Sequence, residues 1–166
     1  MNVNTTSVRR SAARLGAVQA LYQVEAAEAA PGIVVQEFID IRLGSEIEGV
    51  EYADADPEYF SEIVRGVHDQ LDTVDANIDN ALSGSWATNR LDRTVRQILR
   101  AGAWELMARI DVPSKVIINE YVDVTHSFFE NQEPGFVNGV LDRLSRELRP
   151  GELNTGKSSK GQGKAT

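Results

Sequence analysis

Two groups of arginines are the side chains in this sequence whose type and spacing suit binding chemistry. Arg9, Arg10 and Arg14 open the chain, and the four-residue step from Arg10 to Arg14 places both on one face of a helix. Tyr22 follows two turns later. Guanidinium groups grip phosphates and an aromatic ring offers a stacking surface, which is the combination that single-stranded RNA requires. A solvated arginine cluster beside a core tyrosine fits the same residues.

A second arginine group lies in the middle of the chain. Arg93, Arg96 and Arg100 are spaced so that they form one stripe of a helix, and Arg90 extends the stripe at its start. Acidic residues nearby in the sequence are available to pair with it, so a solvated face explains this group equally well. Two such groups in one chain favour an anionic partner without identifying it.

Residues that catalysis would need are sparse. The sequence has no cysteine, and therefore no disulfide, thiolate ligand or cysteine nucleophile. His68 and His126 are far apart and fit no metal-binding spacing. Asp72, Asp75 and Asp79 are helix-spaced acids of the kind that line a solvated helix face. We therefore expect a binding protein with no enzymatic activity, no metal site and no cofactor.

The net charge of −8 argues at first against a nucleic-acid partner. The charge is unevenly distributed, however: residues 1–14 carry +3, residues 15–85 carry −13, and residues 86–166 carry +2. A partner senses charge within about a Debye length, roughly 8–10 Å, so the local patch matters more than the total. The acidic middle of the chain does not exclude an anion-binding face built from its ends.

Apolar residues recur at helical spacing along nearly the whole chain, and no alternating strand pattern appears. The pattern predicts six helices, over residues 8–27, 31–44, 57–82, 91–106, 113–129 and 136–148. The helix over 113–129 carries two apolar rows, which predicts a central position. Residues 44–56 lack a pattern and predict a surface loop.

One domain is expected over residues 1–149, followed by a disordered tail of mainly Gly, Ser and Lys over residues 150–166. No apolar run approaches the ~18 residues of a membrane span, and the start of the chain lacks the apolar core of a signal peptide. These features predict a cytoplasmic protein with no membrane partner.

Four blocks of the sequence resemble the NusB family of bacterial transcription antitermination factors. They read RLGAVQALY at 14–22, RQILRAGAWEL at 96–106, VPSKVIINE at 112–120 and FVNGVLD at 136–142, and they keep the order and spacing of the family. The resemblance implies an all-α fold of two packed helical subbundles with about six to seven helices. It also implies binding of the boxA element of ribosomal RNA leader transcripts, jointly with the ribosomal protein NusE, in the antitermination complex of RNA polymerase.

The resemblance also implies an RNA-binding set. Arg10, Arg14 and Tyr22 fall at the family's N-terminal contacts, Arg100 occupies the arginine of a leucine–arginine pair, and two phenylalanines flank a turn that shapes the RNA surface. The complete predicted set is Arg9, Arg10, Arg14, Tyr22, Arg96, Arg100, Phe128 and Phe136. Residues 11–13 and 133–135 lack positive charges common in the family, which makes joint recognition with NusE more important.

Three alternatives stay open at this point. The first is a protein-only adaptor that docks a basic partner on its acidic second and third helices. The second is the RNA-binding domain of a ribosomal RNA cytosine methyltransferase, whose catalytic domain needs cysteines that this chain lacks. The third is a homodimer that pairs through the RNA-binding surface and inhibits itself.

Overall fold

The computed structural model describes residues 3–42, 46–47, 50–51, 55–82 and 87–152. The first part of the chain forms α1 (Val3–Ala27), α2 (Pro31–Glu37), a π-helical turn η1 (Phe38–Arg42) and the strands β1 (Glu46–Ile47) and β2 (Val50–Glu51). The rest forms α3 (Pro57–Asp69), α4 (Leu71–Ala81), a 3-10 turn η2 (Thr88–Arg90), α5 (Arg93–Ala108), α6 (Ser114–His126) and α7 (Glu133–Leu148). The prediction of an all-α protein is confirmed, apart from a two-residue antiparallel hairpin.

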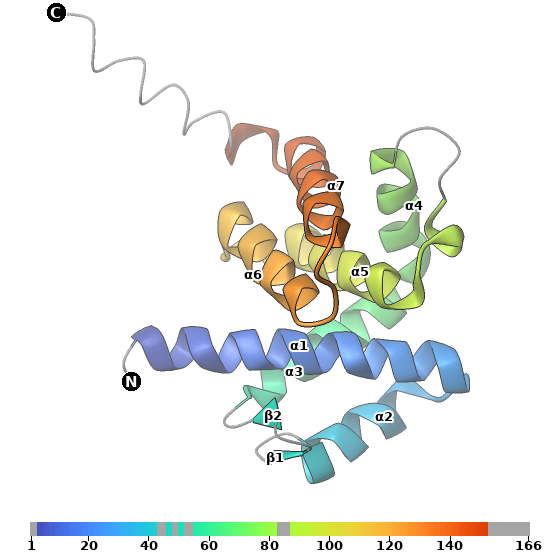
Figure 1. The fold of residues 1–166 in the computed structure, drawn as a ribbon, viewed down its shortest axis with the longest axis vertical. Helices are drawn as coiled ribbons and strands as arrows, with labels where there is room; N and C mark the ends of the chain where they lie inside the picture. Colours follow the sequence, from blue (N-terminus) through green and yellow to red (C-terminus); the bar gives the residue numbers. More distant parts are fainter. Residues whose placement is uncertain (1–2, 43–45, 48–49, 52–54, 83–86, 153–166) are drawn as a thin grey trace, which may run out of the picture.

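The helices pack as two subbundles, as predicted. α1, α2 and α3 contact one another, and α4, α5, α6 and α7 form the second group. α1 runs the full width of the molecule between them, with α2 and the hairpin on one side and α5, α6 and α7 on the other (Figure 1). α1 therefore packs against α2 and α3 of its own subbundle and against α5 and α6 of the other.

The prediction of one long helix over residues 57–82 is wrong in one respect, because the helix breaks at Gln70. The backbone of Gln70 leaves the helical region (φ −116°, ψ 26°), which separates α3 from α4. α3 packs against α1, α2 and α5, whereas α4 packs against α5 and α7, and the break lets the two halves contact different neighbours. The apolar period continues across the break and no glycine or proline marks it, so the sequence gives no local signal.

Two other expectations need correction. The central helix is α5 rather than 113–129, since every residue from Gln97 to Leu106 is buried, whereas α6 keeps one exposed face. Residues 150–152 form a helical turn rather than the start of a tail. The remainder of the predicted tail, residues 153–166, lies outside the described residues, as does much of the predicted loop over 44–56. Within the described part of the chain, no helix is long and apolar enough to cross a membrane.

The two subbundles approach closely where α3 contacts α5. The indole of Trp104 lies directly on the backbone of Gly66, and a Cβ placed on Gly66 would come within 2.2 Å of the ring. Glycine at this position thus sets the distance between the helices.

Replacing Gly66 by alanine should lower the free energy of unfolding by about 1–3 kcal/mol, because the buried indole has to move. Gly139→Ala is the matched control, since nothing lies within 4 Å of a Cβ there. On the exposed side of α7 it should stabilise the helix by up to ~1 kcal/mol. Urea denaturation of both variants measures the difference, and equal stability would contradict the close approach.

Candidate nucleic-acid interface

Arg14 lies in the interior, with 2% of its side chain exposed. Its Nε donates to Glu105 over 2.8 Å and its Nη2 donates to the same carboxylate over 3.0 Å. Nη2 also lies 2.9 Å from the hydroxyl of Tyr59. Arg14 is one of the residues predicted to contact RNA, and in the structure its donors are used inside the protein, where they tie α1 to α5.

Side chains from α1, α3 and α6 contact the fully buried carboxylate of Glu105. The hydroxyl of Tyr121 on α6 donates to it over 2.5 Å, and the hydroxyl of Tyr59 on α3 donates to it as well. Burial and the charge of Glu105 raise the pKa of both hydroxyls above the ordinary tyrosine value. Both tyrosines therefore keep the protons that they donate to Glu105.

Arg96 and Arg100, which are also in the predicted RNA-binding set, pair with groups of the protein itself. Arg100 makes a two-pronged pair with Asp75 of α4, with N–O distances of 2.9 and 2.8 Å. Arg96 donates to Glu25 of α1 over 2.5 Å. It also donates to three backbone carbonyls around η2, those of Thr88, Asn89 and Leu91. These two arginines hold α1, α4 and α5 together.

Arg9 and Arg10 lie half-buried near the start of α1. The guanidinium of Arg10 sits 4.8 Å above the ring of Tyr59. Among the described residues, its Nε is buried and meets no hydrogen-bond acceptor. Arg10 remains a candidate for phosphate contact, because no carboxylate pairs with it in the described part of the chain.

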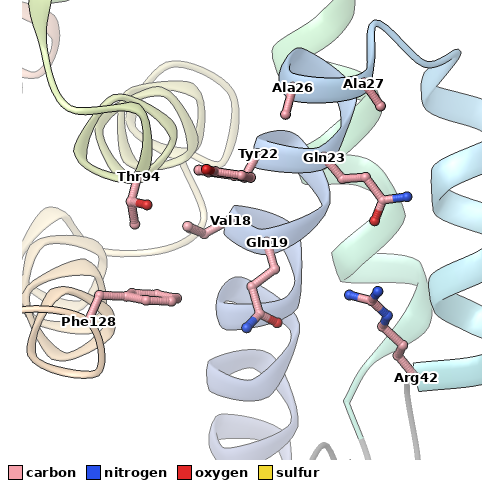
Figure 2. Close-up of a pocket in the computed structure, with 9 residues that line it drawn as sticks. All are labelled: Val18, Gln19, Tyr22, Gln23, Ala26, Ala27, Arg42, Thr94 and Phe128. Carbon is pink, nitrogen blue, oxygen red and sulfur yellow. The ribbon is translucent and has the colours of Figure 1, made fainter.

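Tyr22 and Phe128 lie in one open groove, with 40% and 39% of their surfaces exposed. The groove has a volume of about 570 Å³ and crosses α1. Figure 2 shows Tyr22 and Val18 pointing from α1 toward Thr94 of α5, while the ring of Phe128 points back at α1 from the turn after α6. Polar groups complete the lining: Gln19, Gln23 and Arg42.

Phe136 is separated from this groove. It is 39% exposed at the start of α7 and lines two other hollows, one beside Leu91 and one beside Leu82. The sequence prediction grouped it with Phe128, and no described hollow joins the two rings.

The groove combines the groups that hold a single-stranded base: aromatic faces, side-chain amides and cations. The residues predicted from the sequence did not include the amides of Gln19 and Gln23 or the guanidinium of Arg42, which also line the groove. Gln19 and Gln23 carried a signal, because they are four residues apart and therefore lie on one face of the helix, beside Tyr22. Arg42 carried none, because only the packing of α2 and η1 brings it to α1. Among the described residues, no group of acidic or histidine side chains could hold a metal ion.

Arg14→Met should lower the free energy of unfolding by about 3–5 kcal/mol, because Glu105 would keep a buried charge without its cation. Arg90→Met removes an exposed arginine and should change it by less than ~0.5 kcal/mol. Urea denaturation measures both. A fully stable Arg14→Met variant that lost affinity for RNA would instead identify Arg14 as a phosphate contact.

Stability should fall as the pH rises above about 10. Tyrosines of the unfolded chain lose their protons near that pH, whereas the raised pKa values of Tyr59 and Tyr121 keep both protonated in the folded state. The two hydroxyls therefore contribute their full stabilisation of the fold below pH 10, and this stabilisation is lost as the pH rises above it. Tyr121→Phe should flatten this dependence in urea denaturation between pH 8 and 11. Val124→Ala, a loss of buried volume on the same helix, should keep the wild-type dependence. Equal dependence in the wild type and Tyr121→Phe would contradict this account.

Comparison with known proteins gives consistent results. A family model described as the NusB family matches residues 11–146. The transcription antitermination protein NusB of Brucella anthropi is 49% identical over 148 residues, 89% of this chain and 88% of that protein. Its namesake from Novosphingobium aromaticivorans is 51% identical over 140 residues, 84% of this chain and 95% of that protein.

Solved structures share the fold. The NusB of T. maritima superposes with a TM-score of 0.69 at 27% identity, covering 83% of this chain and 91% of that one. A crystal structure of the antitermination factors NusB and NusE in complex with dsRNA superposes with a TM-score of 0.70 at 23% identity, covering 84% and 97%.

Proposed function

The chain belongs to the NusB family, and from this premise we propose that it is an antitermination factor that binds boxA RNA of ribosomal leader transcripts together with NusE. It acts as a non-catalytic adaptor on the nascent transcript in the cytoplasm, within the antitermination complex of RNA polymerase. The observation that carries the proposal is the open groove with Tyr22 and Phe128 in its walls. Unpaired bases present the flat faces that such rings stack on.

Cations around α1 support the same assignment. Arg42 lines the groove, and Arg9 and Arg10 lie near the other end of α1. The rise of an α-helix places residues 9 and 22 about 20 Å apart along the axis, so the two regions contact different nucleotides of one strand. The strand would follow α1 from its basic start to the groove.

The acidic middle of the chain suits the protein partner. Residues 15–85 carry a net charge of −13, and ribosomal proteins that bind RNA are basic. Complementary charge steers such partners together and fixes their orientation. The solved complex of NusB and NusE with dsRNA shares this fold, which supports the same pairing here.

One observation favours a second function, a protein-only adaptor. Three of the arginines predicted to contact RNA are occupied by carboxylates of the protein itself: Arg14, Arg96 and Arg100. With these three arginines paired inside the protein, RNA binding depends on the groove and on the partner.

Tyr22→Ala should weaken binding of a fluorescein-labelled single-stranded boxA RNA by about 1–3 kcal/mol, because a stacked base loses its platform. Tyr22→Phe keeps the ring and should bind nearly as well. Fluorescence anisotropy in the presence of purified NusE measures both variants, and urea denaturation verifies that the fold is intact.

The outcome separates the two functions. If NusE binds equally well with and without RNA, and the wild-type protein has no measurable affinity for the RNA, the protein-only adaptor is correct. Analytical ultracentrifugation with and without RNA tests the homodimer, since a dimer closed over the groove would dissociate when RNA binds.

A further inference from the structure

Arg93 is an exposed arginine at the edge of the groove that the predicted RNA-binding set leaves out. It is the first residue of α5, and 46% of its side chain is exposed. Its guanidinium carbon lies 5.6 Å from the centre of the Tyr22 ring. Its Nε lies 3.3 Å from the carboxylate of Glu25. The other two arginines of the same stripe, Arg96 and Arg100, are only 13% and 11% exposed.

Glu25 is shared among several donors of α5. Its carboxylate accepts from Arg96 over 2.5 Å and from the amide of Gln97 over 2.8 Å, and it lies 3.4 Å from Arg100. Arg96 and Arg100 have further acceptors, in the η2 carbonyls and in Asp75. If Arg93 swung away, Glu25 would keep its buried partners, and the links between α1 and α5 would stay closed.

We propose that Arg93 binds an RNA phosphate next to the base stacked on Tyr22, and that Glu25 is the internal anion which this phosphate displaces. The proposal rests on the function proposed above. When no RNA is bound, the carboxylate of Glu25 occupies the position next to Arg93 that the phosphate would take. The side chain of Arg93 is thereby held against the ring of Tyr22, close to where a nucleotide would place its backbone.

The energetics allow the exchange. An exposed pair such as Arg93 and Glu25 adds little stability, because water and salt screen it. A guanidinium grips phosphate through two parallel hydrogen bonds, which a single contact at 3.3 Å does not match. Competition from Glu25 therefore lowers the affinity for RNA slightly and does not block the site.

A double-mutant cycle tests the exchange with the boxA RNA and NusE, by anisotropy over a series of KCl concentrations. Glu25→Gln keeps an acceptor oxygen for Arg96 and should tighten binding about two- to fivefold. Arg93→Ala should reduce the slope of log K against log salt by roughly 0.7, the loss of one phosphate contact. In the Arg93→Ala background, Glu25→Gln should bring no gain.

Two matched controls separate a local exchange from a general effect of charge. Glu28→Gln removes the same charge from an exposed residue near the end of α1 and should give less gain than Glu25→Gln. Arg90→Ala removes an exposed arginine just before α5, and Glu25→Gln should keep its full gain in that background. Thermal unfolding midpoints verify that each variant is folded.

Each of these results supports or contradicts the exchange of Glu25 for a phosphate at Arg93. The exchange is overturned if Glu25→Gln brings no gain, if the gain persists without Arg93, or if Glu28→Gln matches it. Should Glu25→Gln not fold, the salt slope of Arg93→Ala decides alone, and an unchanged slope overturns the proposal. Failure of the wild-type protein to bind the RNA would instead contradict the function proposed above.

Discussion

The fully buried carboxylate of Glu105 accepts hydrogen bonds from helices of both subbundles. A charge without solvent has to be neutralised by partners with good geometry, or the fold loses several kcal/mol. Arg14, Tyr59 and Tyr121 supply those partners from α1, α3 and α6. One side chain on α5 thus fixes the positions of helices from both subbundles. The groove is lined from α1, α5 and the turn after α6, which are elements held by the same carboxylate.

A second set of charges repeats this arrangement at the other end of α1. Glu25 and Asp75 receive the arginines of the α5 stripe, and a guanidinium suits the task because its planar fork meets two acceptors at once. These pairs explain how an acidic chain contains so many arginines without a broadly basic surface. Many of its cations neutralise its own acids, among them Arg14, Arg96 and Arg100.

Helical periodicity recovered most of the elements but not the direction that each arginine faces. Equal spacing shows that Arg96 and Arg100 share a stripe, and it does not show whether the stripe faces water or the core. For Arg14 a signal was present, because Ala17, Val18 and Leu21 follow it at core spacing and are all buried. The break at Gln70 had no such signal, since it follows from the contacts of α3 and α4 with different helices.

The family's shared blocks and the buried charges now have a common explanation. The block at 14–22 contains Arg14, which faces inward, and Tyr22, which faces the groove, so one helix carries both a structural pair and a binding surface. Because α1 is held by Glu105 and by Glu25, Tyr22 is already in place before any ligand arrives. Binding to a site that is already formed loses less conformational entropy than binding to a mobile one. The acidic part of the surface is then left for a basic partner.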